Sequence, residues 1–422
     1  MSEQTKSRRR SRRRRGRGRK NAPGQQQGGG GHNHKAPRPD DVPYGPQLRI
    51  EVSGVLELSP DGQGWLRNIE DDFTPEETDP YVPAAISLAE NLRPGVVLSG
   101  GAERIKGRVT LVEIETVDGM TAEEAAALPI FKQLTSIDPT EHFVLEGAEE
   151  EPGDNGASES MRVLDLVTPI GKGQRGLITA PPRSGKTILL QQIANRISTE
   201  YPEVHLMVLL VDERPEEATH FRRTVKGEVI ASTNDEPAER HTRVTELTIE
   251  RAKRLVERGQ DVVIVMDSLT RLGRAYNVTV RNSGRTLSGG VDSRTLEKPK
   301  AFFGAARNVE NGGSLTIVAT ALIETGSRMD EVIFEEFKGT GNMELILSRE
   351  LAERRIWPAI DINRSGTRKE ELLLPSEVYR KVVMLRRVMS QMHPVEAMQL
   401  LMAKIRETRD NTAFLASFEV RR

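Results

Sequence analysis

The chain has 422 residues and no cysteine, and it carries 61 Lys or Arg against 62 Asp or Glu, for a net charge of −1. This composition excludes disulfides and thiolate metal sites, and the length allows two or three domains. The apolar runs are far too short to span a bilayer, and the N-terminus lacks the apolar stretch of a secretory signal. We therefore expect a cytoplasmic protein with no membrane partner.

Residues 1–46 are predicted to form a disordered basic arm. Residues 1–39 hold 13 Lys or Arg and one acidic residue, so their charge is about +12 and that of the remainder about −13. A segment rich in Arg, Gly, Gln and Pro has too little apolar surface to fold by itself. Arginine-rich arms bind RNA or DNA by releasing counterions, which favours a nucleic-acid partner over a tail that only improves solubility.

Residues 47–120 are predicted to form a small β-barrel. The stretch "LRIEVSGVLELSPDGQGWLRN" alternates apolar and polar residues around the turn "SPDGQG", and "VVLSGGA" and "GRVTLVEIETV" indicate two further strands. Several short strands within so few residues are typical of a barrel. Residues 121–157 are interpreted as a partly ordered linker that ends in an acidic, flexible stretch.

Residues 158–422 alternate apolar strands with helical stretches. This order predicts an α/β domain whose sheet is mostly parallel and covered on both faces. The expected strands are Leu177–Ala180, Val204–Val211, Val262–Asp267, Leu315–Thr320 and Met343–Leu347. The expected helices are Gly185–Ile197, Thr245–Arg258 and Met329–Phe337.

The stretch "APPRSGKT" matches a phosphate-binding loop, with Ala180 in place of the first Gly of the pattern. A strand precedes it and a helix follows, as such a loop requires. Gly185 lets the backbone approach the phosphates, and the helix N-terminus favours an anion. Lys186 is expected to reach the β- and γ-phosphates, and Thr187 to ligate Mg²⁺.

Two other strands end in acidic residues. Asp267 closes "DVVIVMD" at the carboxyl edge of the sheet, where it can hold Mg²⁺ through water. Glu213 closes "HLMVLLVDE" and is the candidate for polarising the attacking water, although a helix cap or a surface acid is the alternative. Arg214 beside it is a candidate for contacting phosphate or for relaying the state of the site across a subunit boundary.

Two arginine-bearing segments complete the candidate chemistry. Arg364 and Arg368 flank a Ser-Gly-Thr turn, which suits a guanidinium presented to a transferring phosphoryl group, unless the turn is merely solvated. In the barrel, Trp65 and Arg67 lie two residues apart on one strand face, and Tyr81 offers a second ring. This combination suits base stacking beside a phosphate contact, with a core role for Trp65 as the alternative.

Residues 48–422 resemble the bacterial transcription termination factor Rho, a family of ring-forming, RNA-dependent ATPases. The stretches that carry the resemblance are "GKGQRGLITAPPRSGKT", "LLVDERPEEAT", "MDSLTRLGRAYN", "GGVDSRTLEKPKAFFGAARN", "EEFKGTGNMEL" and "AIDINRSGTRKEELL". The resemblance implies a RecA-like P-loop ATPase core and an N-terminal OB-fold, cold-shock-like barrel. It also implies a homohexamer that uses ATP and Mg²⁺ to move 5′ to 3′ along nascent single-stranded RNA as a helicase and terminate transcription. RNA polymerase and elongation factors are the further partners it implies.

The resemblance also assigns sites. It implies ATP binding by Gly171, Lys172, Gly173, Gln174, Arg175, Gly176, Arg183, Ser184, Gly185, Lys186, Thr187, Ile188, Arg214 and Trp357. It implies catalysis by Lys186, Glu213 and Arg368, with Arg368 as an arginine finger entering the neighbouring subunit's site, and metal ligation by Thr187 and Asp267. In the barrel it implies RNA binding by Gly62, Gln63, Gly64, Trp65, Leu66, Arg67, Asp79, Pro80 and Tyr81. In the hole of the ring it implies RNA binding by Thr286, Leu287, Ser288, Gly289, Gly290 and Arg328.

Two positions depart from the family pattern. Gln63 and Val109 stand where better-known members have aromatic rings. Each stacked base is worth about 1–3 kcal/mol, so we expect weaker or less pyrimidine-selective binding by the barrel, with the basic arm compensating. Two alternative functions remain at this stage: a catalytic subunit of a rotary ATPase, and an RNA-binding scaffold with a vestigial ATPase.

Overall fold

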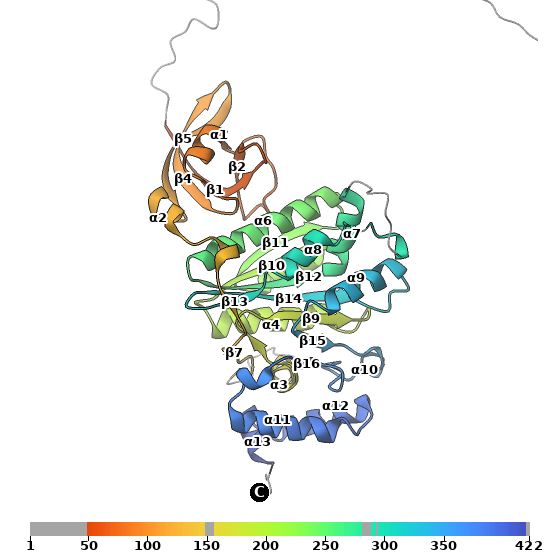
Figure 1. The fold of residues 1–422 in the computed structure, drawn as a ribbon. Helices are drawn as coiled ribbons and strands as arrows, with labels where there is room; N and C mark the ends of the chain where they lie inside the picture. The colour runs from red at the N-terminus through yellow and green to blue at the C-terminus, as the bar shows by residue number, and fades with distance from the viewer. Residues whose placement is uncertain (1–48, 148–155, 281–287, 293, 419–422) are drawn as a thin grey trace, which may run out of the picture. The chain divides into compact units, whose positions relative to one another are not determined.

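Inward-facing apolar residues close a small barrel near the N-terminus of the computed structural model, which describes residues 49–147, 156–280, 288–292 and 294–418 (Figure 1). The strands pair in the order β1 (Ile50–Leu58), β2 (Gly64–Arg67), β3 (Tyr81–Val82), β5 (Arg108–Val117) and β4 (Val97–Ile105). The side chains that fill the barrel are fully buried or nearly so: Leu56, Leu66, Val82, Leu98 and Leu111. A short helix, α1 (Ala84–Ala89), follows β3. The predicted barrel is confirmed.

A larger sheet forms the centre of the second domain. Its main order is β11 (Glu228–Thr233), β10 (His205–Glu213), β12 (Asp261–Asp267), β14 (Ser314–Leu322), β9 (Arg175–Ala180), β15 (Met343–Ile346) and β16 (Gly366–Thr367). The pairs from β11 to β15 are parallel, and β16 is antiparallel to β15. Two short strands extend the sheet beside β14: β13 (Arg307–Val309) and β6 (Ser136–Ile137).

Helices cover both faces of this sheet, as its apolar strands require. Along β10, Val208 and Leu210 enter one core cluster, whereas Met207 and Leu209 enter the other, because successive side chains point to opposite faces. The first cluster is shared with α3 (Ala157–Val167), α4 (Lys186–Glu200), α5 (Pro215–Thr224), α10 (Arg349–Glu353), α11 (Ser376–Met389), α12 (Pro394–Arg406) and α13 (Asn411–Ala416). The second is shared with α6 (Ala238–Glu257), α7 (Leu269–Thr279), α8 (Glu297–Phe303) and α9 (Arg328–Lys338).

The segment between the two domains is more structured than the predicted linker over residues 121–157. It contains α2 (Ala122–Ala127), a 3₁₀ turn at Phe131–Gln133, β6, and β7 (His142–Phe143), which pairs with β8 (Ile170–Gly171). Phe131 is buried, and its backbone N–H donates to the Glu257 carboxylate on α6 at 2.7 Å. This segment is ordered because it packs on the nucleotide-binding domain. The predicted acidic, flexible stretch lies in part at 148–155, outside the described residues.

The barrel is joined to α6 by one apolar anchor and several ion pairs. Phe73, in the loop after β2, is fully buried within the core cluster that contains Val244 and Leu247 of α6. Three ion pairs also reach α6, Glu57 with Arg243, Asp118 with Arg251 and Arg93 with Glu257, and a fourth, Asp72 with Arg222, reaches α5. Both domains belong to the unit Leu48–Arg422.

Each strand and helix expected in the second domain occurs, with shifted ends. α6 begins at Ala238 rather than at Thr245, because its polar first turn gives no apolar signal. The sequence reading did not name α5, whose buried residues are only Ala218 and Phe221.

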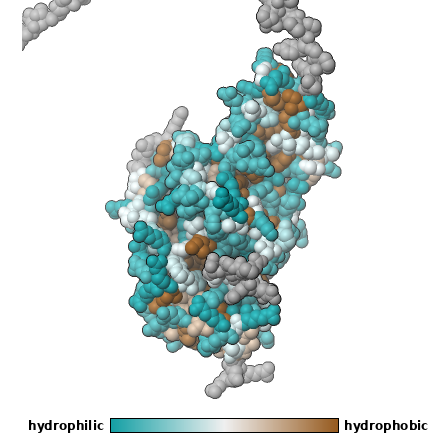
Figure 2. Space-filling model, turned by 180° about the vertical axis from the view of Figure 1, so that it is seen from behind, coloured by the Kyte–Doolittle hydropathy of each residue, from teal (hydrophilic) through white to brown (hydrophobic). Residues whose placement is uncertain are grey.

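The surface shown in Figure 2 is largely hydrophilic, with apolar residues in scattered patches. Among the described residues, no helix combines the length and apolar character that crossing a membrane would demand.

Candidate nucleotide and RNA sites

The predicted phosphate-binding loop connects the carboxyl end of β9 to the start of α4. β9 ends at Ala180 and α4 begins at Lys186, so the helix N-terminus faces the loop. Gly185 has φ +82°, and a Cβ there would lie 2.7 Å from Cζ3 of the Trp357 ring. The Ser184 hydroxyl donates to the carbonyl of Pro181 at 2.7 Å and fixes the turn. The local geometry is therefore that of an anion cradle at a helix N-terminus.

Lys186 lies between two strand-end carboxylates. Its Nζ donates to Oδ1 of Asp267 and lies 3.9 Å from Oε2 of Glu213. Oδ1 of Asp267 also accepts from the Thr320 hydroxyl at 2.9 Å. The structure thus brings together three residues predicted from separate motifs.

The same residues suit a hydrated Mg²⁺. Oδ2 of Asp267 is buried and has no hydrogen-bond partner among the described residues, which leaves a hard oxygen for a metal or its water. The Thr187 hydroxyl donates to Oε2 of Glu217 at 3.1 Å. When bound, Mg²⁺ would neutralise phosphate charge, and Thr187 and Asp267 are the residues that would hold it. Glu217, in the first turn of α5, is a nearby carboxylate that the sequence analysis missed.

Glu213, the predicted general base, is buried next to an arginine. It ends β10, is 3% exposed, and lies 3.2 Å from Nη2 of Arg271 on α7. Burial, and next the charge of Asp267, raise the pKa of Glu213 above its ordinary value, while Arg271 and Lys186 oppose the rise. A carboxylate with a raised pKa accepts a proton from water more readily. Arg271 was also missed; its only sequence signal is its place one helical turn after Asp267.

We expect Glu213→Gln to abolish steady-state ATP hydrolysis while leaving nucleotide affinity within about twofold, because the amide fills the same space but is no base. Phosphate release and fluorescent-nucleotide titration measure the two properties. Glu216→Gln is the matched control, because it removes an exposed carboxylate in the first turn of α5, and we expect it to retain turnover. Wild-type turnover in the Glu213 variant would show that the base has been assigned wrongly.

A half-open cleft of about 470 Å³ adjoins the phosphate-binding loop. Two of its lining residues are exposed apolar side chains, Ile188 at 62% and Trp357 at 41%. An aromatic ring beside a helix N-terminus provides a stacking surface for a nucleobase. The cleft therefore fits the predicted role of both residues in ATP binding.

The other predicted ATP-binding residues divide between two edges of the sheet. Arg183 lies in the phosphate-binding loop, and Arg214 is the N-cap residue of α5. Both are therefore at the carboxyl edge. The stretch Gly171–Gly176 instead precedes or begins β9, at the amino edge. Lys172 pairs there with Glu141 and with Asp261, the first residue of β12. Within this chain, these residues do not belong to the pocket around Lys186.

Arg368 also lies at the amino edge. Its backbone N–H donates to the carbonyl of Asn342, the residue before β15, at 2.8 Å. Burial, and next the positive charge of Arg368, lower the pKa of Arg175 at the start of β9. Within the described residues, no hydrogen bond or ion pair engages the Arg368 guanidinium. Arg368 is exposed and is therefore accessible to another molecule. Arg364 on the same turn is exposed as well.

Three of the predicted RNA residues of the barrel, Trp65, Arg67 and Tyr81, form a row with Arg108 on its outer face. Trp65 and Tyr81 are directly paired across β2 and β3, with ring centroids 6.0 Å apart in an edge-to-face arrangement. Cζ of Arg67 lies 5.5 Å from the centre of the Trp65 ring, and Cζ of Arg108 lies 4.9 Å from that of Tyr81. Two rings flanked by two guanidiniums suit single-stranded nucleic acid. Arg108 was missed because its ring partner is distant in sequence.

The remaining predicted barrel residues play different parts. Asp79 accepts from Arg67, and Gln63 accepts from the Tyr81 hydroxyl at 3.1 Å. Leu66 is 2% exposed inside the barrel, so its side chain supports the face rather than contacting RNA. Gly62, Gly64 and Pro80 shape the chain: Gly62 has φ +85°, a Cβ on Gly64 would meet Leu56, and the Pro80 carbonyl accepts from Leu66 N–H.

The two predicted loops of the ring's hole meet in the structure. Ser288–Gly290 form a short 3₁₀ turn, and a Cβ on Gly289 would lie 2.8 Å from the carbonyl oxygen of Arg328, the first residue of α9. Arg328 is exposed. Thr286 and Leu287 lie outside the described residues.

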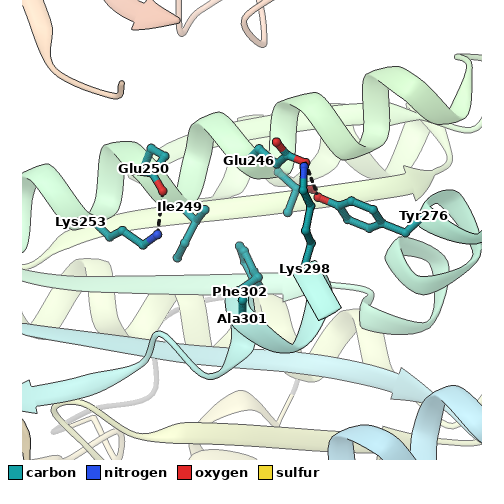
Figure 3. A pocket seen from close by; sticks show the side chains of 9 residues that line it. Glu246, Ile249, Glu250, Lys253, Tyr276, Lys298, Ala301 and Phe302 are labelled. Atoms are coloured by element: carbon teal, nitrogen blue, oxygen red, sulfur yellow. Dashed lines mark hydrogen bonds and ion pairs between the residues drawn. The ribbon is translucent and has the colours of Figure 1, made fainter. Parts of the chain in front are cut away.

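A second cavity of about 210 Å³ lies between α6, α7 and α8 (Figure 3). Glu246 accepts from the Tyr276 hydroxyl at 2.8 Å and from Nζ of Lys298 at 2.6 Å, and Lys253 donates to Glu250. Its charged groups are therefore paired with one another, and none of its residues belongs to the predicted sites.

The fold and the sites define a P-loop ATPase of the RecA type that carries an RNA-binding barrel. Family models agree: residues 160–367 match the nucleotide-binding domain of the ATP synthase alpha/beta family, and residues 52–123 match the RNA-binding domain of Rho termination factor. Among solved structures, a type III secretion system ATPase matches with a TM-score of 0.54 and 22% identity, covering 67% of this chain and 86% of that one. This likeness supports the fold of the ATPase core.

Curated relatives cover nearly the whole chain. Transcription termination factor Rho of Pseudomonas aeruginosa is 50% identical over 375 residues, which is 88% of each chain. Rho of Cereibacter sphaeroides is 52% identical over 367 residues, 86% of each chain. The chain belongs to the transcription termination factor Rho family.

Proposed function

We propose that this chain is an RNA-dependent ATPase that assembles into a closed ring, a homohexamer, and uses ATP with Mg²⁺ to move along nascent single-stranded RNA and terminate transcription. The observation that carries this proposal is the division of the ATP-binding residues between opposite edges of one sheet. β9 lies between the residues at the two edges. Its six residues make five steps of about 3.3 Å, so the two edges are about 16 Å apart along this strand. A nucleotide at Lys186 is therefore completed by Arg368 and its neighbours from an adjoining copy. Such head-to-tail contacts close into rings.

Arg328, which is proposed to face the hole of the ring, is linked through α9 and α7 to the carboxyl edge of the sheet. Arg328 begins α9, and Asp330 two residues later forms a two-bond pair with Arg274 of α7 at 2.8 and 2.6 Å. α7 begins at Leu269, directly after Asp267 and Ser268. RNA held by Arg328 thus acts on a helix that is anchored beside the metal-holding carboxylate.

In this mechanism, Lys186 and the start of α4 bind the phosphates, and Glu213 takes a proton from the attacking water. Arg368 of the neighbour stabilises charge on the transferring phosphoryl group. Both RNA sites, on the barrel and in the hole, bind one strand. RNA polymerase and elongation factors are the proposed partners, and the cytoplasm is the proposed location.

The barrel favours this function over a rotary ATPase. A barrel that serves only to pack a ring has no need of two partly exposed aromatic rings flanked by two arginines. The intact cluster of Lys186, Glu213 and Asp267 favours it over an RNA-binding scaffold without turnover.

Phosphate release with and without C-rich single-stranded RNA tests the function. We expect stimulation of about tenfold or more, because RNA orders the ring and its shared sites. The Glu213→Gln chain is the control for contaminating ATPases. Turnover that ignores RNA would favour the rotary alternative, and no turnover would favour the scaffold.

We further expect deletion of residues 1–40 to flatten the salt dependence of RNA binding. Log K falls with log salt by about 0.7 for each phosphate neutralised on a single strand, and the deleted segment is strongly cationic. Titration of a labelled oligonucleotide at several salt concentrations measures the slope. A deletion chain with an unchanged slope would show that the arm makes no phosphate contacts in the complex.

A further inference from the structure

One carboxylate in the barrel holds two arginines that belong to different domains. Glu57 lies on β1 directly opposite Trp65. Its Oε2 accepts from Nε of Arg67 at 2.6 Å and from Nη2 of Arg243, on α6, at 2.8 Å. Its Oε1 accepts from Nε of Arg243, so the latter guanidinium binds both oxygens.

The three groups are largely withdrawn from solvent, with side-chain exposures of 22% for Glu57, 9% for Arg67 and 23% for Arg243. Burial alone would raise the pKa of Glu57, but the two guanidiniums outweigh it and hold this pKa below its ordinary value. Glu57 is therefore a carboxylate near neutral pH, and its bonds are charge-assisted.

The position of Arg67 depends on this arrangement. Its guanidinium is held between Glu57 and Asp79 while it lies over the Trp65 ring. Arg243 competes for the same carboxylate and also donates to the carbonyl of Phe73 at 2.8 Å. A change on α6 therefore alters how strongly Glu57 holds Arg67.

α6, which carries Arg243, also contacts the strand next to Glu213. Near the start of α6, Nδ1 of His241 lies 2.7 Å from the hydroxyl of Ser232 on β11. β11 ends beside Glu213, whose carbonyl accepts from the N–H of Asn234 at 3.0 Å. The helix that holds Glu57 is thus packed against the strand that flanks the hydrolysis site.

We propose that Glu57 is a positioning residue that fixes Arg67 for RNA binding and makes the barrel's affinity for RNA depend on Arg243 of the nucleotide-binding domain. This inference rests on the proposed RNA-dependent function. It identifies the Glu57–Arg243 pair as a contact that links the RNA-binding face of the barrel to the nucleotide-binding domain.

A double-mutant cycle tests it in the full chain, with Glu57→Gln, Arg243→Gln and the combined variant titrated against a labelled oligo-C RNA. We expect R243Q to weaken binding about tenfold in the wild-type background, because the freed carboxylate turns to Arg67 and draws it from Trp65. In the E57Q background we expect less than about twofold, because the shared acceptor charge is gone.

Arg251→Gln is the matched control. It removes another buried pair between α6 and the barrel, with Asp118, that does not reach the RNA face. We expect R251Q to leave RNA affinity unchanged. Equal losses in R251Q and R243Q, or losses that multiply in the double variant, would overturn the inference.

Thermal unfolding of each chain separates positioning from misfolding. Arg243→Lys keeps the charge but loses the two-bond contact, so it is expected to lose RNA affinity less than R243Q; it replaces that variant in the cycle if R243Q does not fold. A wild-type chain that binds no RNA would overturn the proposed function and this inference together. Additive losses with intact wild-type binding would overturn this inference alone.

Discussion

The parallel sheet imposes the constraint on which the molecule depends: it places the phosphate-binding loop and Arg368 at opposite edges. Lys186, Glu213 and Asp267 meet at the carboxyl edge because parallel strands end together there. The amino edge collects Lys172, Arg175 and Arg368. A guanidinium fixed to its own sheet cannot cross that distance, so in the proposed ring each ATP site is completed by Arg368 of a neighbouring copy.

In the proposed function, this division is how RNA controls hydrolysis. Turnover in the proposed ring depends on how neighbouring copies are arranged, and we propose that a strand held by the barrel and by Arg328 acts on that arrangement. Within the chain, α6 contacts the barrel through Arg243 and Glu57. α7 contacts α9, which begins at Arg328, through Arg274 and Asp330. Both helices lie on the same face of the sheet, in one core cluster.

The sequence was sufficient for the parts of the site whose signals are local. A strand, a loop and a helix start predict Lys186, and apolar strands ending in acids predict Glu213 and Asp267. Arg271, Arg108 and the joint of Glu57 with Arg243 were not predictable, because each depends on a partner brought close only by folding. Helix α5 was missed because its apolar stripe is too short. The family resemblance supplied Gly171–Gly176, and the predicted strand Leu177–Ala180 already places them at the end opposite Lys186, but only the structure shows that Arg368 lies at their edge.

Single-turnover ATP hydrolysis in mixed assemblies tests the shared site most directly. Chains carrying Glu213→Gln and chains carrying Arg368→Ala are mixed before assembly, with RNA present, and each parent alone serves as the reference. If two copies build each site, about a quarter of randomly formed interfaces join an intact Glu213 to an intact Arg368, and hydrolysis reappears in the mixture although neither parent has it. A mixture as inactive as its parents, or an R368A chain that hydrolyses ATP at the wild-type rate, would contradict the account.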